Sequence, residues 1–494
     1  MFAESRGNPY RGWCPASLRE PSKDPLQCLR KPMFEDAQGL RLTTTSADAA
    51  TAFDAAVSDY LDYRSSAFVQ LKAALTADPE FVMALCFRAC FFQMMETAVV
   101  RPKVQGWLDE MQPLLDGVTD RERAHVRAVQ AWVDGDIIGA TSTWEMILAE
   151  HPLDIIALKL HHYLTFWTGR SHALRAVTAG ALPAWDATIP GYASVLGMHA
   201  FALEETGNHM GAEAIGREAV ERNPNDLWAI HSVAHVLETQ GRSAEGVAWL
   251  DYPTDAWDDR NPFRAHVWWH AALFNAAQAN YDKVLSLYDT EISSVNTAQN
   301  VDVQNLASVL IRLDLRGVDV GDRWQALAEH SEARIGDHVI AFNDMHWSLA
   351  MAAGGRTEAA ARHADAMAEF ASTDSGWTAH VFALVGTDLC RGLTAWGNHD
   401  FAGAADLLWP IKDDLAPIGG SHAQRDLFPQ VLGDALLRAG RFAQARSLYA
   451  ERVTLRPSAR TDWEHLSTAL AALGDTTGAA AATESAAAAT EPAA

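Results

Sequence analysis

Apolar side chains recur at three- and four-residue spacing along most of this 494-residue chain, and the strict alternation typical of strands is scarce. Small residues interrupt this helical pattern at regular places, with a Gly followed five residues later by Ala and seventeen residues later by Pro. Three segments fit without a gap: Gly135/Ala140/Pro152, Gly207/Ala212/Pro224 and Gly440/Ala445/Pro457. The pattern predicts pairs of helices, because Gly ends a first helix and Ala lets the second helix approach closely.

This spacing is typical of tetratricopeptide repeats, whose units bury their apolar faces against their neighbours. Partial copies keep only the Gly and the Ala, at Gly355/Ala360 and Gly474/Ala479, so degenerate repeats extend over most of residues 45–480. We therefore expect an all-α protein. Its residues 40–475 should form a single superhelical α-solenoid of degenerate tetratricopeptide-like helix pairs.

The two ends of the chain differ from this middle part. Residues 1–32 combine Pro, Gly and mixed charges without a helical period, which predicts a disordered leader. Residues 476–494 form an Ala-rich, low-complexity tail. Because this tail carries no bulky apolar side chain that could dock it, we expect it to fray.

Charge and composition exclude several classes of partner. The formal net charge is −24, so repulsion disfavours nucleic acid and anionic membrane surfaces as partners. The sequence shows neither an apolar run long enough to span a membrane nor the pattern of a signal peptide, and we expect a cytoplasmic protein. Five cysteines without metal-ligand spacing predict free thiols. Nothing in the pattern indicates the oligomeric state.

Two histidine pairs form the constellation that looks most like chemistry. His231 and His235 are followed 35 residues later by His266 and His270. Histidines four residues apart lie on one face of a helix, and an offset close to one repeat places the second pair beside the first. Counted within their repeats, these positions line the concave face of the solenoid, where ligands bind. We expect all four side chains to converge in one cavity within roughly 10 Å.

Acidic residues and one further histidine extend this candidate site. Glu238 lies three residues after His235 and should share its helix face. Asp344 and His346 fall in a later repeat, with His346 at a concave-face position. The candidate catalytic residues are therefore His235, His270, Asp344 and His346, with Glu238 as a ligand-binding residue.

Three interpretations of this set remain open. His231, His235, His266 and His270 could bind a divalent metal ion, with zinc, iron and manganese as the candidates. A metal-free site could use one histidine as acid and base, oriented by Asp344 or Glu238. In the third interpretation, the histidines only bond to one another, to tryptophans and to water.

Two other segments carry candidate ligand-binding residues. Trp268 and Trp269 adjoin the second histidine pair, and one of them should form an apolar wall beside the imidazoles. The string GGSHAQRD, which contains Arg425 and Asp426, reads as a loop entering a helix, where backbone amides and Arg425 could hold a carboxylate or phosphate. The alternative is that Arg425 and Asp426 only pair with neighbouring groups.

Several longer strings resemble the tetratricopeptide repeat protein 38 family over about residues 40 to 455. They are LTTTSADAATAFDAAVSDYL, TDRERAHVRAV, WEMILAEHPLDIIALKL, NPNDLWAIHSVAHVLE, HVWWHAALF, GDRWQAL, DHVIAFNDMHW and GGSHAQRD. The resemblance implies the repeat fold and no particular reaction. It begins near Met33, which predicts that translation starts there or that residues 1–32 are dispensable.

Two classes of function follow from these observations. One is an enzyme, such as a hydrolase, lyase or oxygen-utilising enzyme, that encloses a small molecule in a histidine-rich pocket. The other is a non-catalytic adaptor that binds a peptide or partner protein in its groove. Adaptor grooves usually present Lys, Arg and Asn, whereas the corresponding positions here carry histidine, which favours the enzyme.

Overall fold

The computed structural model of the protein describes residues 33–293 and 300–489. The leader expected over residues 1–32 lies outside the described residues, as do residues 490–494. Most of the described chain is helical, and its single sheet is an antiparallel pair of short strands. The expectation of an all-α solenoid is therefore confirmed.

The Gly and Ala residues of the repeats act as the spacing predicts. Gly135, Gly207 and Gly440 each follow the first helix of a pair with a positive φ of 81°, 83° and 70°, a conformation that glycine adopts without strain. Ala140 and Ala212 are fully buried where the second helix packs against the first. Side-chain caps then start the second helices, as where Asp136 accepts a hydrogen bond from the amide of Gly139.

The elements of the first half are β1 (Met33–Glu35), β2 (Arg41–Thr43), α1 (Ala47–Leu61), α2 (Ala67–Ala77), α3 (Val82–Gln93), α4 (Arg101–Met111), α5 (Asp120–Val133), α6 (Ile137–Glu150), α7 (Ile155–Phe166), α8 (Ser171–Ala181), α9 (Tyr192–Glu204), α10 (His209–Arg222), α11 (Leu227–Thr239) and α12 (Ser243–Trp249). The second half contains α13 (Phe263–Ala277), α14 (Tyr281–Leu287), α15 (Asn300–Asp314), α16 (Arg323–Glu332), α17 (Ala341–Ala353), α18 (Thr357–Thr373), α19 (Trp377–Val381), α20 (Thr387–Gly397), α21 (Phe401–Leu408), α22 (His422–Arg425), α23 (Leu427–Arg438), α24 (Phe442–Leu455), α25 (Arg460–Ala472) and α26 (Thr476–Ala488). Short 3-10 segments (Ala98–Val100, Gln112–Gly117, Leu182–Ala184, Trp409–Ile411, Ala416–Ile418) and π segments (Tyr288–Ile292, Phe382–Gly386) join or extend them.

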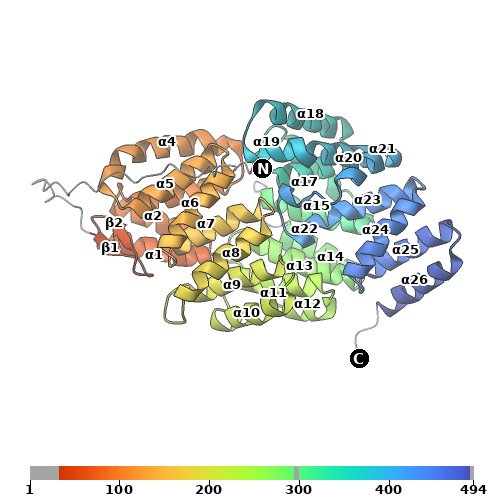
Figure 1. Ribbon diagram of the computed structural model, residues 1–494, viewed down its shortest axis with the longest axis horizontal. Helices are drawn as coiled ribbons and strands as arrows, with labels where there is room; N and C mark the ends of the chain where they lie inside the picture. Colours follow the sequence, from red (N-terminus) through yellow and green to blue (C-terminus); the bar gives the residue numbers. More distant parts are fainter. Residues whose placement is uncertain (1–32, 294–299, 490–494) are drawn as a thin grey trace, which may run out of the picture.

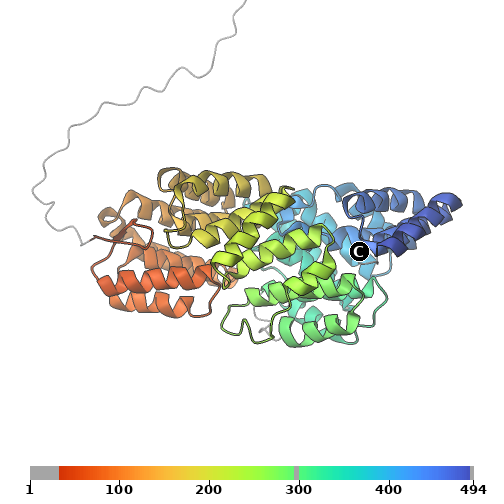
Figure 2. The ribbon, with the colours of Figure 1, turned by 90° about the horizontal axis from the view of Figure 1, so that it is seen from below.

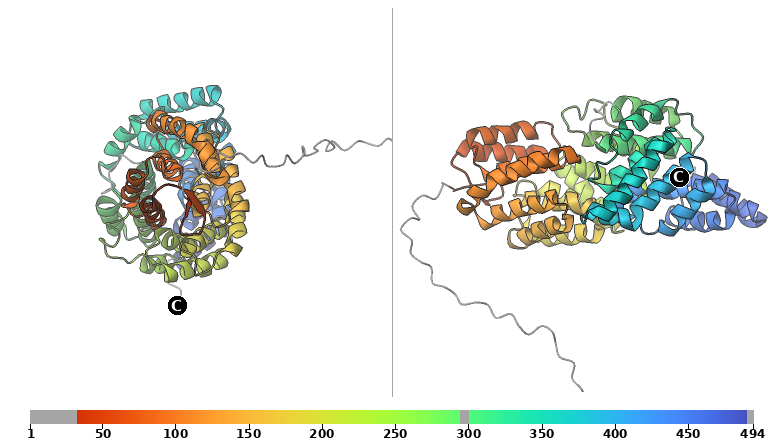
Figure 3. Two further views of the ribbon diagram at one scale, coloured as in Figure 1. Left: turned by 90° about the vertical axis from the view of Figure 1, so that its left-hand side faces the viewer. Right: turned by 90° about the horizontal axis from the view of Figure 1, so that it is seen from above.

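The helix pairs stack along an elongated molecule, with the first repeats at one end and α25 and α26 at the other (Figures 1 and 2). The stack also curls about the long axis of the molecule, so that the helices surround that axis when they are viewed along it (Figure 3, left). Buried apolar side chains run along this stack in two large clusters, and Tyr163 and Phe263 pack against both of them.

The curl brings segments far apart in the sequence into direct contact. The amide of Trp377 donates to the carbonyl of Gly135 at 3.1 Å, and the amide of Ala98 donates to the carboxylate of Asp337 at 2.5 Å. The amide of His422 donates to Glu205 at 3.0 Å. The short helix α22 therefore lies against α11 and beside Glu205, at the end of α9.

The tail differs from the expectation of fraying. Residues 476–488 form α26, which Asp475 caps at its first turn by accepting from the amide of Gly478. Ala479, Ala482 and Ala486 are buried against the preceding helix, α25. Alanine side chains are small enough to let the two helices approach closely, so the helix packs without a bulky apolar residue.

No helix within the described part of the chain is long and apolar enough to cross a membrane. The cysteines of this part, Cys86, Cys90 and Cys390, are free and buried, as the sequence predicts.

Candidate metal centre

His231, His235, His266 and His270, here called the four-histidine cluster, lie on α11 and α13. Asp226 starts α11 by accepting hydrogen bonds from the amides of Trp228 and Ala229. Each pair spans one helical turn, so its two rings leave the same face. Because α11 and α13 are neighbouring first helices of successive repeats, the two faces meet.

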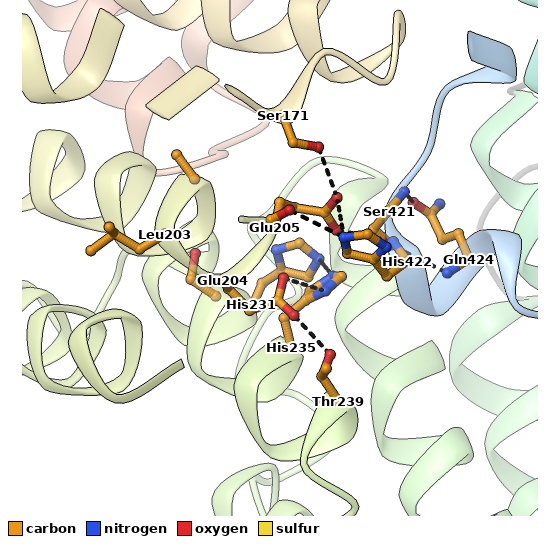
Figure 4. Close-up of polar contacts among 12 residues, drawn as sticks. Ser171, Leu203, Glu204, Glu205, His231, His235, Thr239, Ser421, His422 and Gln424 are labelled. Atoms are coloured by element: carbon orange, nitrogen blue, oxygen red, sulfur yellow. Dashed lines mark hydrogen bonds and ion pairs between the residues drawn. The ribbon is translucent and has the colours of Figure 1, made fainter. Parts of the chain in front are cut away.

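The four imidazoles converge. Nε2 of His231 lies 3.0 Å from Nε2 of His235 and 3.1 Å from Nε2 of His266. The ring of His270 lies 4.6 Å from that of His235 between centroids, and one nitrogen from each of the four rings falls within 4.8 Å of the others. The four side chains thus converge within the expected distance, but none of them lines a described cavity, so the expected opening of this site into a cavity is not found. Figure 4 shows the contact between His231 and His235.

The Nδ1 atoms of His266 and His235, which point away from the centre of the cluster and are here called the outer nitrogens, have oxygen atoms near them. Nδ1 of His266 lies 2.8 Å from Oδ1 of Asn305 on α15, and Nδ1 of His235 lies 3.6 Å from Oε2 of Glu204 on α9. An acceptor at Nδ1 keeps the proton on that nitrogen and leaves the Nε2 lone pair directed inward. Asn305 therefore prepares the ring of His266 as a ligand, whereas Nδ1 of His235 lies near Oε2 of Glu204 without a hydrogen bond to it.

Burial sets the charge state of this cluster. The four rings are between 0% and 5% exposed, and this loss of hydration lowers the pKa of every one of them. The pKa of His266 falls to about 4. Neighbouring imidazoles lower the pKa of His231 further. All four rings are accordingly neutral near pH 7, which is the form that binds metal ions.

The arrangement fits a divalent ion better than it fits a hydrogen-bonded group of rings. A hydrogen on Nε2 of His231 can be donated to only one of its two Nε2 neighbours. Around an ion with Zn–N distances of about 2.0–2.1 Å, tetrahedral ligands lie roughly 3.3 Å apart, which is close to the observed separations. Both nitrogens of His270 are buried and have no hydrogen-bond partner. Such groups are costly to bury unless something binds them.

Glu204 and Glu205 add negative charge beside this cluster. Their carboxylates and His235 each offer an atom within 4.8 Å of the others. Thr239 donates to Oε1 of Glu204 at 2.7 Å, while Oε2 has no hydrogen-bond partner (Figure 4). Burial, followed by the charge of Glu205, raises the pKa of Glu204 well above its usual value. A cation bound by the histidines would compensate this charge.

The sequence analysis missed Glu204 and Asn305. They lie on helices next to α11 and α13, 31 residues before His235 and 39 residues after His266. The only signal for them in the sequence is that each lies about one repeat away from a histidine of the cluster. Many other residues have the same spacing, so the signal is not specific.

Glu238 does not reach the four-histidine cluster, and the expectation that it shares their site is wrong. Its carboxylate lies 3.5 Å from Arg456, in a cleft at the end of α11. Three residues advance a side chain about 4.5 Å along the helix axis and leave it about 60° from the starting direction, so Glu238 lies beyond the rings, at the end of α11.

Asp344 and His346 also lie apart from this cluster, so the proposed catalytic set of His235, His270, Asp344 and His346 does not form. Asp344 instead lies 2.7 Å from Nδ1 of His338 and 3.4 Å from Nε2 of His363. Nδ1 of His346 donates to the carbonyl of Phe342 at 2.8 Å. Both residues lie on α17, the first helix of a repeat two repeats after that of α13. Their side chains therefore enter a different part of the core.

Trp269 is the aromatic wall that the sequence predicts. Its ring stacks on His266 with centroids 4.9 Å apart, and its Nε1 donates to Ser308 at 3.1 Å. Trp268 points elsewhere and packs against Trp257.

The GGSHAQRD segment does run from a loop into a helix start, where Ser421 and Gln424 form a capping box. The carboxylate at this start belongs to the chain itself, because the amide of His422 donates to Glu205 (Figure 4). Arg425 donates to the carbonyls of Gly419 and Gly420, and Asp426 pairs with Arg452 at 2.9 Å. Pairing with neighbouring groups is therefore the interpretation that the geometry supports.

No known protein-family model matches the sequence. Among solved structures, the chain is similar to a Rap protein in complex with competence and sporulation factor, at 12% identity and a TM-score of 0.42 over 70% of this chain and 99% of that one. It is also similar to a human IFIT1 dimer with PPP-AAAA, at 12% identity and a TM-score of 0.39 over 89% and 94%. The APC/C hetero-tetramer Cut9-Hcn1 matches at 11% identity and a TM-score of 0.36 over 90% of each chain. Similarity at this level concerns the helical-repeat architecture alone. The ligands of those proteins are not carried over to this chain.

Proposed function

We propose that this protein is a tetratricopeptide-like repeat protein that binds one divalent metal ion through His231, His235, His266 and His270. The observation that carries this proposal is the approach of Nε2 of His231 to 3.0 Å from Nε2 of His235 and 3.1 Å from Nε2 of His266, while Nδ1 of His266 faces Oδ1 of Asn305. Neutral imidazoles with inward lone pairs repel one another unless a cation lies between them.

Zinc and iron suit this ligand set better than manganese. Imidazole is a good ligand for zinc, copper, iron and nickel, whereas manganese favours carboxylate and water oxygens. Four protein ligands without an open position are typical of a structural metal site, because catalytic zinc keeps one position for water or substrate. We infer that the ion joins α11 to α13 and stabilises the curl of the solenoid at this repeat.

The metal-free acid/base interpretation is less well supported. A general acid or base must reach a substrate, whereas these rings are 5% exposed or less. The residues that line the cavities described near them do not include any of the four. If the protein is an enzyme, its reacting groups therefore lie outside the four-histidine cluster.

Metal analysis of the purified protein tests the proposal. We expect about one zinc or iron ion per chain by inductively coupled plasma mass spectrometry. His270→Ala should lower this content at least tenfold, because its ring is one of only four ligands. Removal of the ion with a chelator should lower the melting temperature of the wild-type protein.

His162→Ala is the matched control. His162 is also a buried histidine without a hydrogen-bond partner at either nitrogen, but it lies on α7, outside the cluster. This variant should lose stability through its cavity and keep its metal. Metal-free wild-type protein, or equal metal loss in both variants, would overturn the proposal.

An adaptor that binds a peptide or partner protein is the second candidate. Solenoids of helical repeats commonly present concave binding surfaces, which favours this function for the fold as a class. The metal would then support the scaffold, so the two proposals are compatible. A pull-down with the His270→Ala variant tests whether the metal takes part in partner binding. A purely structural ion should affect partner binding only as far as it affects folding.

We also propose that the chain belongs with the tetratricopeptide repeat protein 38 family. The support is the set of strings that carry the resemblance, among them NPNDLWAIHSVAHVLE and HVWWHAALF, which contain all four histidines of the cluster. Recovery of the same four histidines in other members would support both proposals together.

A further inference from the structure

A cleft of about 590 Å³ opens where the ends of α11, α13 and α15 face α23, α24 and α25. It is separate from the four-histidine cluster, although it begins only one helical turn beyond it. Leu237 and Glu238 follow His235 on α11, and Phe274 lies four residues after His270 on α13. This volume is within the range of roughly 300–1,000 Å³ that is usual for small-molecule sites.

Besides Arg460 and Glu464, four arginine side chains and four carboxylates line this cleft. One of these carboxylates, Asp434, pairs with Arg438 outside the lining, and the other three pair with arginines inside it. Asp426 holds two of the arginines, with Arg452 at 2.9 Å and Arg456 at 3.1 Å. Arg452 also pairs with Asp462 at 3.0 Å, and Arg456 lies 3.5 Å from Glu238. These two arginines therefore already share all three carboxylates.

Arg312 and Arg316, the other two arginines, make no ion pair with a carboxylate among the described residues. Arg312 donates to the carbonyl of Ala423 at 2.7 Å and to Ser308, and Arg316 donates to the carbonyl of Arg312 at 2.7 Å. Arg312 is buried, and desolvation lowers its pKa to about 10, which still leaves it charged at neutral pH. Guanidinium groups with neutral partners in a chain of net charge −24 are suited to an anion from outside.

The walls of the cleft favour an organic anion. Phe274, Tyr281 and Tyr449 contribute aromatic surface, and Tyr449 packs against His465 with ring centroids 4.9 Å apart. At the rim, Arg460 and Glu464 pair with each other at 2.7 Å, so they do not change the balance of charge inside. Arginines without ion-pair partners and aromatic groups in the same lining match a ligand with an acidic group on an organic body.

We propose that this cleft is a binding site for a small organic anion whose carboxylate or phosphate group contacts Arg312 and Arg316. The site does not depend on the metal proposal, because the residues that line it do not include any of the four histidines. Arg316 is the residue to test, because Arg312 also holds the backbone of Ala423 and supports the fold.

Isothermal titration calorimetry of the purified full-length protein at constant ionic strength provides the test, with succinate and inorganic phosphate as probes. We expect at least one of them to bind the wild-type protein. Arg316→Gln should weaken that binding roughly tenfold or more, since a hydrogen bond to a charged group is lost. Preference for succinate would identify a carboxylate ligand, and preference for phosphate a phosphorylated one.

Two controls keep the result interpretable. Arg222→Gln removes an equal charge from an exposed pair with Glu218 and should leave the binding of the probe unchanged. Succinamide, which has nearly the same shape as succinate without its charge, should not bind the wild-type protein, a comparison that holds even if Arg316→Gln fails to fold. Absence of binding by both anions, equal binding of succinamide, or equal loss in the Arg316→Gln and Arg222→Gln variants would overturn the proposal. If removal of the metal with a chelator were enough to abolish anion binding, the cleft would not be independent of the metal site.

Discussion

His266, His338 and His346 are all buried, yet their Nδ1 atoms face different partners. Asn305 accepts from His266, Asp344 lies against His338, and the carbonyl of Phe342 accepts from His346. Of the three, only His266 has its other nitrogen directed at further imidazoles. The partner of the outer nitrogen and the neighbours of the inner one together decide which histidine can bind a metal ion.

Acidification should lower the free energy of unfolding wherever a buried histidine is neutral in the folded protein. His346 gives the clearest case. Burial lowers its pKa from 6.5 to about 4. Between these values the unfolded chain binds a proton that the folded chain does not, so stability falls as the pH falls from 6.5 towards 4. His346→Gln should remove a contribution of roughly 1.4 kcal/mol per pH unit from this slope.

Urea unfolding of metal-stripped wild-type and His346→Gln proteins across this pH window measures the effect. Stripping both proteins keeps loss of metal out of the comparison. Parallel slopes in the two proteins would show that His346 is not protonated on unfolding in this window.

At the scale of elements, α26 illustrates how a weakly patterned segment becomes ordered. Its alanines pack on α25, and Ser467 of α25 lies 2.9 Å from both the carbonyl of Ala479 and the hydroxyl of Thr483. Terminal helices of solenoids cover the apolar face of the last repeat and present a more polar face to water. Among the described residues, α26 therefore covers the apolar face of α25.

Deletion of residues 476–494 should expose the face of α25 that carries Leu466, Ala469 and Leu470. We expect a lower melting temperature and self-association, because an uncovered repeat face is apolar. Light scattering after size-exclusion chromatography measures the second effect. Deletion of residues 490–494 alone keeps α26 and should cause neither change, and identical behaviour of the two truncations would contradict the capping role.

At the scale of the whole molecule, close backbone contacts determine how the solenoid curls. Gly169 follows α7 with a φ of 65° and lies directly against the carbonyl of Ala416. Gly419, with a φ of 91°, meets the carbonyl of Trp167 in the same region. A side chain at either position would separate the two segments, so small residues are required where the curled stack meets itself.

Gly169→Ala should loosen this contact, because a Cβ atom there would overlap the carbonyl of Ala416. We expect a larger radius of gyration by small-angle X-ray scattering and a lower melting temperature. Gly207→Ala is the matched control, since its φ of 83° imposes similar backbone strain of roughly 1–2 kcal/mol while its Cβ would meet open space. An equal radius of gyration in the two variants would contradict the importance of this contact.

The four-histidine cluster was predictable from the sequence because its geometry is local. Four-residue spacing fixes the face of one helix, and a one-repeat offset fixes its neighbour, so the convergence of His231 with His266 needs no knowledge of the rest of the chain. The partners of these rings were not predictable in the same way. Glu204 and Asn305 come from helices on either side, and their rotation depends on packing.

The sequence by itself determined the helical repeats, their boundaries at Gly135, Gly207 and Gly440, and the convergence of the histidine pairs, since all of these follow from periodicity within one or two repeats. The tertiary structure decided which distant segments meet. The curl places α22 against α11 and joins the amide of His422 to Glu205, at the end of α9. Small rotations between successive helix pairs accumulate along a solenoid, and the total rotation cannot be predicted from the sequence pattern of one or two repeats.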